Sequence, residues 1–275
     1  MTTLEQWPGQ RLHAPFGRRS TGVTERITYG PYVVLTVSDP GGPRPAAGQF
    51  YMLTASERWG AGEAGRPYLP RAFSVLRAPA GTDELQFLLE DVGPGTKRLC
   101  QLRPGDELLL VGPLGQGFRP PREGRQPLLV GGGVGIAPLA ICQDSLTPGA
   151  PALLGFRDGG RARAGVLLRD ARLATDAGPV GHRGPVTDLL REQLTSPAVE
   201  VYACGPPGML EAVRALCAES EVPAQLALEA GMACGFGACF GCVVPTRRGY
   251  VRLCLEGPVL EADRLDTAVF AGAGH

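Results

Sequence analysis

Four cysteines near the C-terminal end restrict this chain more than any other feature of its sequence. They are spaced Cys234-x4-Cys239-x2-Cys242-x11-Cys254, and the intervals between the first three match a plant-type loop whose four thiolates hold a [2Fe–2S] cluster. Small residues separate the first two, so the backbone can wrap closely and point N–H groups at the sulfurs. A four-cysteine zinc site and a disulfide pair are the alternatives, but zinc ligands usually come in pairs about two to four residues apart. We therefore expect all four cysteines to be cluster ligands.

Length and charge exclude several other classes of protein. The chain has 275 residues, 44% of them hydrophobic, enough for about two domains and a small third. Lys plus Arg and Asp plus Glu both number 27, and this zero net charge argues against binding to nucleic acid or to a membrane surface. No apolar run reaches the roughly 18 residues of a membrane span, and the first residues lack the apolar core of a secretory signal. We expect a cytoplasmic protein, in which thiols stay reduced and the cysteines serve metal or redox chemistry.

The first part of the chain is typical of a small antiparallel barrel. Short apolar runs bounded by Gly, Pro and Asp indicate strands, and runs at this spacing favour a closed barrel. They are Ile27–Val37, Gln49–Thr54, Ala72–Leu76, Glu84–Glu90 and Glu107–Val111. We expect an N-terminal extension over residues 1–21, the barrel over 22–120 and a proline-rich linker at its end.

After the linker, strands alternate with helices. The pattern predicts strands at Leu128–Val130, Ala152–Gly155 and Val199–Ala203 and helices at Thr187–Leu194 and Met209–Glu219. This alternation predicts a parallel sheet with right-handed crossovers over residues 121–225. Residues 226–275, rich in Gly and Cys, form the predicted cluster domain and tail. The predicted fold class is therefore multidomain, β followed by α/β.

A glycine-rich loop follows the first of these later strands. Gly131, Gly132, Gly133 and Gly135 precede Pro138, which stands where the G-x-G-x-x-G dinucleotide fingerprint has its last glycine. Such a loop lets the backbone approach a pyrophosphate, and a helix N-terminus supplies free N–H donors. We expect the four glycines to bind a nucleotide; a tight turn without a ligand is the alternative.

A second strand-to-helix turn carries Cys204, Gly205 and Pro206. Open α/β sheets bind ligands at the carboxyl ends of their strands, so we expect this turn beside the glycine loop, with Cys204 facing a nicotinamide. No acid or base catalyst is predicted. A buried structural cysteine is the alternative, since free cysteine is commonly buried. We favour that interpretation for three others, Cys100, Cys142 and Cys217.

Two motifs in the barrel favour anion binding. Arg71-Ala72-Phe73-Ser74 offers a planar guanidinium suited to a pyrophosphate, with a small hydroxyl on the same strand. Gly95 and Thr96 stand in a glycine turn, in which Thr96 is expected to cap a short helix. A surface arginine and a capped turn without a ligand are the alternatives.

Together these residues resemble the ferredoxin-to-NADP reductase superfamily and, within it, the electron-transfer subunits of class 1B dihydroorotate dehydrogenases. The resemblance covers residues 22–265 and includes several further motifs. They are Gly48-Gln49-Phe50, Gly112 to Phe118, Gly155-Phe156-Arg157, Ala174-Thr175-Asp176, Gly184 to Leu190 and Cys254 to Val259. The run from Met232 through the cysteines is the most specific, because a reductase with its cluster at this end belongs to a narrow group.

The resemblance implies an FAD-binding barrel, an NAD-binding domain and a [2Fe–2S] domain, in that order. It implies FAD contacts at Arg71, Ala72, Phe73 and Ser74, at Leu88, Leu89 and Glu90 on the next strand, and at Gly95 and Thr96 near the phosphates. Two positions depart from the family pattern, since Ala72 stands where proline is common and Glu90 where arginine is common. The interval before Cys254 is also short, which indicates a trimmed hairpin.

The resemblance also implies electron transfer in pyrimidine (UMP) biosynthesis. Electrons from dihydroorotate would first reach FMN in a separate catalytic subunit and would then pass through the cluster and FAD of this chain to NAD+. The two kinds of chain would form a heterotetramer with two copies of each. A (β/α)8 partner needs about 250 residues of its own, so it must be another chain. The first alternative is an NAD(P)H-dependent flavin and iron–sulfur reductase that serves an oxygenase, a hydrogenase or a ferredoxin-linked enzyme. The second alternative, from another class, is a nucleotide-binding regulator that is stabilised by zinc and has no redox function.

The sequence leaves the choice between NAD and NADP open. Arg157, Arg161 and Arg163 follow the second strand of the sheet, where they favour a 2′-phosphate. Asp158 beside them favours the ribose hydroxyls of NAD.

Overall fold

The computed structural model describes residues 17–60, 66–147, 149–195, 198–270 and 272. Most of the expected extension over residues 1–21 lies outside these ranges, and its last residues already belong to strand β1 (Arg19–Tyr29). Among the described residues, no helix has the length and apolar character needed to cross a membrane.

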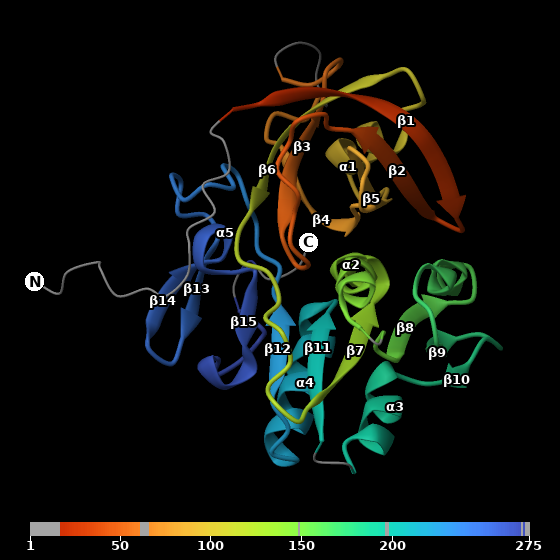
Figure 1. Ribbon diagram of the computed structural model, residues 1–275, viewed down its shortest axis with the longest axis vertical. Helices are drawn as coiled ribbons and strands as arrows, with labels where there is room; N and C mark the ends of the chain where they lie inside the picture. Colours follow the sequence, from red (N-terminus) through yellow and green to blue (C-terminus); the bar gives the residue numbers. More distant parts are fainter. Residues whose placement is uncertain (1–16, 61–65, 148, 196–197, 271, 273–275) are drawn as a thin grey trace, which may run out of the picture.

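The first domain is a closed antiparallel barrel with strand order β1-β2-β5-β4-β3-β6 (Figure 1). After β1 come β2 (Tyr32–Ser38), β3 (Phe50–Ala55), β4 (Arg71–Arg77), β5 (Glu84–Glu90) and β6 (Glu107–Leu114). The run predicted as one strand at Ile27–Val37 is a hairpin, because Gly30 turns the chain with a φ of 62°. Leu35, Tyr51 and Phe87 fill the barrel and are fully buried, each contributing about 1.5–3 kcal/mol through burial.

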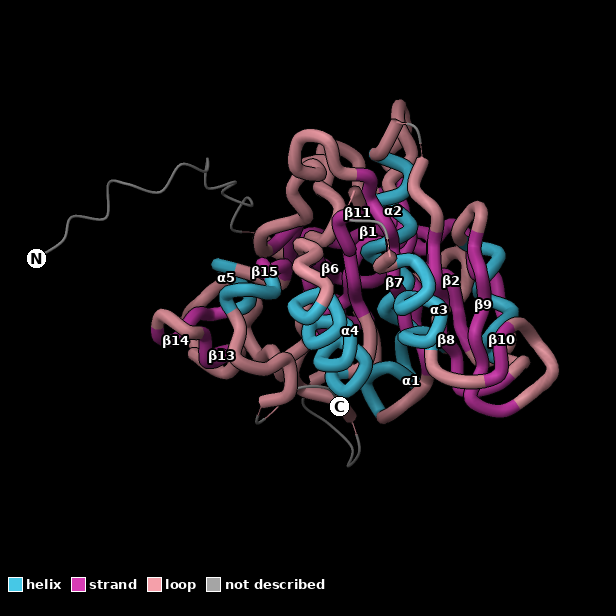
Figure 2. The backbone as a smooth tube through the Cα atoms, turned by 90° about the horizontal axis from the view of Figure 1, so that it is seen from below, coloured by secondary structure: helices cyan, strands magenta, loops and turns pink. Residues whose placement is uncertain are grey.

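The second domain is a sheet in the order β10-β9-β8-β7-β11-β12-β15. The strands are β7 (Gln126–Gly132), β8 (Ala152–Asp158), β9 (Ala171–Ala177), β10 (His182–Arg183), β11 (Val199–Cys204), β12 (Ala224–Ala227) and β15 (Val259–Glu261). Six of them run parallel, as predicted, and β15 is antiparallel to β12. Figure 2 shows β7, β8 and β9 side by side. The order reverses between β7 and β11, and such a switch point is where open α/β sheets bind ligands.

Helices connect these strands and cover the sheet. They are α1 (Pro94–Cys100) in the barrel domain, then η1 (Gly133–Ile136), α2 (Ala137–Ser145), η2 (Arg161–Leu167), α3 (Val186–Gln193) and α4 (Pro207–Glu219). The predicted helices at Thr187–Leu194 and Met209–Glu219 correspond to α3 and α4. The apolar cores on the sheet include Leu139 of α2, Leu189 of α3 and Leu210 of α4.

The C-terminal segment is built onto the sheet and is not a detached unit. The predicted boundary after residue 225 falls inside β12, and β15 returns to pair with that strand. Between them lie the hairpin of β13 (Val243–Thr246) and β14 (Gly249–Arg252) and the short helix α5 (Leu253–Glu256), and η3 (Ala262–Arg264) follows β15. The physical reason is burial, since Leu226 and Leu260 of the paired strands share one apolar core with Cys242 and Cys254.

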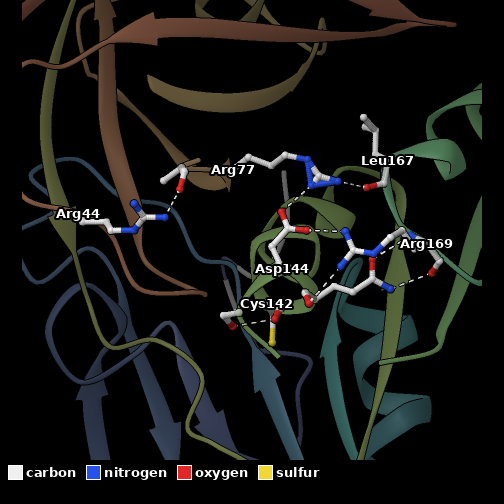
Figure 3. A network of polar contacts seen from close by, with 9 residues as sticks. Arg44, Arg77, Cys142, Asp144, Leu167 and Arg169 are labelled. Atoms are coloured by element: carbon white, nitrogen blue, oxygen red, sulfur yellow. Dashed lines mark hydrogen bonds and ion pairs between the residues drawn. The ribbon is translucent and has the colours of Figure 1, made fainter. Parts of the chain in front are cut away.

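Apolar contacts and ion pairs join the barrel to the sheet. Helix α2 lies between them (Figure 1), and Leu76 of the barrel shares a core with Leu139 of this helix. Arg77 of β4 pairs with Asp144 of α2 at 2.8 Å, and Asp144 also binds Arg169 at 2.9 Å (Figure 3). These contacts set the orientation of the two domains.

Candidate functional site

The four predicted cluster ligands come together in the C-terminal segment as two pairs. The Sγ atoms of Cys242 and Cys254 lie 3.2 Å apart, because the β13–β14 hairpin returns the chain to the cysteine loop. Cys234 and Cys239 form the second pair, in which the backbone N–H of Cys239 donates to the sulfur of Cys234 at 3.4 Å. Cys239 is exposed, whereas Cys242 and Cys254 are buried. One side of the site is therefore open and the other is closed by protein.

Glycines allow the cysteine loop to fit against the barrel. Gly235 and Gly237 have φ values of 80° and 88°, in the left-handed region that favours glycine. A Cβ on Gly235 would collide with Met52 of β3, and one on Gly237 would lie 2.5 Å from Leu255. The loop thus packs directly on the barrel, which places the cysteines beside the predicted flavin domain.

Backbone N–H groups favour thiolates at this site. Burial acts to raise the pKa of Cys234, but N–H groups of the loop and the Cys239 side chain outweigh it and bring that pKa to about 7. The contact between the sulfurs of Cys242 and Cys254 lowers the pKa of Cys242 to about 6 and raises the pKa of Cys254. Thiolates are the metal-binding form of cysteine, so the lowered pKa values of Cys234 and Cys242 favour metal binding, whereas Cys254 would have to lose its proton to bind a metal.

The paired arrangement fits a two-iron cluster. Four thiolates hold the two irons of a [2Fe–2S] cluster, whereas zinc takes all four sulfurs around one ion at about 2.3 Å. In the part of the chain that the structure describes, no three His, Cys, Asp or Glu side chains are grouped around one metal position. The four cysteines as iron ligands stay a prediction, which this geometry supports.

In the barrel, the structure brings together the two predicted anion-binding motifs. The side chain of Arg71 lies over the start of α1, where a Cβ on Gly95 would be 2.6 Å from its Nε. The guanidinium also lies 5.9 Å from the ring of Trp59 and donates to the carbonyl of Leu69 at 2.6 Å. Arg71 and the first turn of α1 thus form one surface of positive potential, as a phosphate group needs.

The expected capping role of Thr96 is not seen. The N-cap of α1 is Gly93, without a side-chain cap, and Thr96 lies within the first turn. Its hydroxyl accepts the N–H of Val92 at 2.9 Å and donates to the carbonyl of Gly93 at 3.0 Å. Thr96 therefore fixes the turn that precedes the helix and does not cap the helix itself.

The remaining predicted flavin contacts lie on β4 and β5, which are neighbours in the barrel. Ala72 is exposed, and Phe73, Ser74 and Glu90 are half-buried. Leu88 and Leu89 are buried in two different cores, so only their backbone is free to face a ligand. The β4–β5 pair presents one edge of the barrel toward the nucleotide sheet.

The glycine loop packs against the Cys204 turn, backbone against backbone. A Cβ on Gly135 would lie 2.5 Å from the carbonyl oxygen of Cys204, and one on Gly132 would lie 2.9 Å from Pro206. The two loops meet at the switch point between β7 and β11, as predicted from the sequence. Gly132 and Gly135 are therefore required in part because the two loops pack closely against each other. Gly133 differs, because a Cβ at this residue, whose φ is 55°, would meet only the Tyr32 hydroxyl, at 3.6 Å.

Cys204 is buried next to a carboxyl group that the sequence analysis did not identify. Burial raises the pKa of the Cys204 thiol, and the charge of Glu229 adds to the effect. Burial also raises the pKa of Glu229, although its side chain keeps an exposed surface. The parallel register of β11 and β12 aligns Cys204 with Ala227, two residues before Glu229. The sequence analysis did not predict β12 and therefore could not place Glu229 beside Cys204.

Comparisons with known proteins agree with this architecture. The family model for the iron-sulfur cluster binding domain of dihydroorotate dehydrogenase B matches residues 229–266. A solved NADH-dependent reduced ferredoxin-NADP oxidoreductase superposes with a TM-score of 0.76 at 23% identity, over 90% of each chain. A ferredoxin NADP+ reductase from Neisseria gonorrhoeae superposes with a TM-score of 0.59 at 21% identity, over 74% of this chain and 91% of that one. Fold and site together define a protein of the ferredoxin–NADP reductase fold with a C-terminal iron–sulfur domain.

Sequence relatives narrow this class to one family. The electron transfer subunit of dihydroorotate dehydrogenase B (NAD(+)) from Clostridium acetobutylicum is 34% identical over 221 residues, which is 79% of this chain and 85% of that protein. The subunit of the same name from Geobacillus thermodenitrificans is 34% identical over 255 residues, 87% of this chain and 91% of that protein. The chain belongs to the family of electron transfer subunits of dihydroorotate dehydrogenase B (NAD(+)).

Proposed function

We propose that this chain carries electrons between a dihydroorotate-oxidising catalytic subunit and NAD+, in the cytoplasm and as part of pyrimidine biosynthesis. The observation that carries the proposal is the four-cysteine loop, which packs on the barrel at Met52 and shares a core with the nucleotide sheet. When bound, FAD supplies the exchange between hydride transfer with NAD+ and single-electron transfer with a [2Fe–2S] cluster, chemistry that no side chain here provides.

The protein's own residues bind and orient these groups. Arg71 and the first turn of α1, with Gly95 and Thr96, hold the FAD phosphates, and the β4–β5 edge from Ala72 to Ser74 and from Leu88 to Glu90 holds the rest of FAD. Cys234, Cys239, Cys242 and Cys254 hold the iron. The glycines of the first loop and the Cys204–Pro206 turn form the floor on which NAD lies. The buried Cys204 excludes water from one side of that floor.

The partner would bind over the open side of the cysteine loop. Cys239 is exposed there, and so are three aromatic side chains of the loop and the hairpin, Phe236, Phe240 and Tyr250. Arg252 holds Phe240 by a cation–π contact of 4.9 Å and donates to the carbonyl of Gly237 at 3.0 Å. Aromatic side chains with arginine are typical of protein interfaces. We assign this face to the FMN-containing catalytic subunit, in an assembly with two copies of each chain.

The test compares the chain alone with the chain co-expressed with its candidate catalytic subunit. We expect acid-labile sulfide and a low-temperature paramagnetic signal after reduction in both preparations. We expect dihydroorotate-dependent reduction of NAD+ only when both subunits are present. Oxidation of dihydroorotate by this chain alone would contradict the division of labour. Failure to copurify, together with NADH-dependent reduction of an unrelated ferredoxin or oxygenase, would favour the alternative reductase.

A further inference from the structure

A cluster of three charged side chains joins the two domains at the carboxyl end of β8. Arg161, the first residue of η2, donates to Glu90 Oε1 from Nε at 3.1 Å and from Nη2 at 2.7 Å. It also donates from Nη1 to Asp158 Oδ2 at 2.6 Å, and its backbone N–H binds Asp158 Oδ1 at 2.9 Å. The side chains of Arg161 and Glu90 are only 27% and 18% exposed, so solvent screens their charges less than at an open surface.

The cluster lies between the barrel and the sheet, on the strand that pairs with the one leading into the glycine loop. Strand β8 pairs in parallel with β7, with Gly155 opposite Gly132, and continues to Asp158. In βαβ nucleotide folds, the acid that binds the ribose hydroxyls follows the glycine loop by about 20 residues, and Asp158 stands at that place. Tyr32 of the barrel connects the two features, because its hydroxyl faces Gly133 and the charge of Glu90 acts on it.

The barrel contributes the decisive carboxylate. Glu90 ends β5, at a position where the superfamily pattern commonly has arginine, and here the guanidinium comes from the other domain through Arg161. The three side chains together carry one net negative charge. Arg157 and Arg163 remain exposed, but Arg161 has its guanidinium bound between two carboxylates and is not available to a phosphate.

We propose that the Glu90–Arg161–Asp158 cluster makes this chain select NAD over NADP. The inference rests on the proposed function, because it assumes that the dinucleotide binds at this end of the sheet. The ribose hydroxyls of NAD can donate to a carboxylate, whereas the 2′-phosphate of NADP brings two negative charges toward a cluster that is already negative. Selection thus depends on a residue of the barrel as well as on the nucleotide domain.

The test measures equilibrium binding of NAD+ and of NADP+ to the purified holoprotein by isothermal titration calorimetry. In the variant Glu90→Gln/Asp158→Asn, Arg161 keeps its charge and loses both carboxylates. We expect the ratio of the two dissociation constants to shift toward NADP+ by at least about tenfold. Adding Arg161→Gln to that variant should abolish the gain.

Arg77→Gln is the matched control. Arg77 makes an ion pair between the same two domains, with Asp144 of α2 (Figure 3), so its loss weakens the interface without changing charge at the end of β8. We expect the NAD+ to NADP+ ratio to stay within about twofold of wild type.

The outcomes separate the two proposals. A ratio that stays within about twofold of wild type in the double variant, with NAD+ still bound, overturns the selectivity role and leaves the electron-transfer function intact. Absence of binding of either nucleotide to the wild-type holoprotein overturns the proposed function itself. If the double variant loses its flavin or its circular dichroism spectrum, Asp158→Asn alone replaces it, because Asp158 is not among the predicted flavin contacts. The expected shift is then about threefold, and no shift is the refuting result.

Discussion

Replacing Gly135 by alanine tests whether the glycine loop and the Cys204 turn form one structural unit. The φ of Gly135 lies outside the left-handed region, so the cost of a side chain there is steric. The new Cβ would lie 2.5 Å from the carbonyl oxygen of Cys204 and 2.6 Å from Cα of Gly205. Ordinary contact begins at 3.4 Å, so the two loops must separate by about 0.9 Å or distort. Both colliding groups are backbone, which cannot rotate away.

We expect Gly135→Ala to lower the free energy of unfolding by about 1–3 kcal/mol, the usual cost of overpacking. The assay is urea unfolding of the holoprotein, followed by far-UV circular dichroism, with NAD+ affinity as a second measurement. Since the loop and turn form the floor of the predicted nucleotide site, affinity should fall by about tenfold or more.

Gly208→Ala is the matched control, because no atom lies within 4 Å of its added Cβ and alanine favours the helix that contains it. We expect it to leave stability unchanged or raised by about 0.5 kcal/mol. If Gly135→Ala unfolds within about 0.5 kcal/mol of wild type and binds NAD+ normally, the two loops are not coupled as described.

Three further predictions concern the cofactor sites and Glu229. Cys239→Ser should abolish the iron–sulfur absorption and labile sulfide, while Cys142→Ser, which changes a buried cysteine outside the site, should keep both. Arg71→Ala should weaken FAD binding by about tenfold or more, measured by flavin release on dilution; unchanged retention would remove Arg71 from the phosphate site. Burial raises the pKa of Glu229 above its ordinary 4.5, so the folded protein binds this proton more tightly than the unfolded chain does. This contribution to stability is full below pH 4.5 and is lost as pH rises to the folded pKa. Glu229→Gln should therefore gain stability relative to wild type between pH 5 and 8, and parallel urea midpoints across that range would show that the carboxyl is not perturbed.

The sequence alone was enough to predict the cysteine site and the two domain types. Cys234, Cys239 and Cys242 lie within one short loop, so chain connectivity itself keeps their sulfurs close, whatever the rest of the fold. The alternation of apolar runs likewise predicts a barrel followed by a parallel sheet, because strand and helix periodicities are local properties. The meeting of the glycine loop with Cys204 followed from a general rule for parallel sheets.

Other features depended on contacts between distant segments. Strand β15 and the Leu226–Leu260 pairing were not visible in the sequence, because a three-residue strand has too little periodicity to be recognised. The position of Glu229 beside Cys204 required the register of β11 with β12. Thr96 was expected to cap a helix, but its hydroxyl binds the turn that precedes the helix. Capping and turn formation use similar local hydrogen bonds of the threonine hydroxyl, and composition does not distinguish between them.

Arg161 shows most clearly what the tertiary structure decides, because only the folded protein shows that carboxylates bind its guanidinium. In the sequence, three arginines that favour NADP and one aspartate that favours NAD stand together after the second strand of the sheet, and the sequence alone does not decide between them. The folded protein brings Glu90 from a different domain to within 2.7 Å of Arg161. Charge interactions act through space and fall off with distance, so the electrostatic character of this site is a property of the packed domains. The type and spacing of the predicted cluster ligands are properties of the chain.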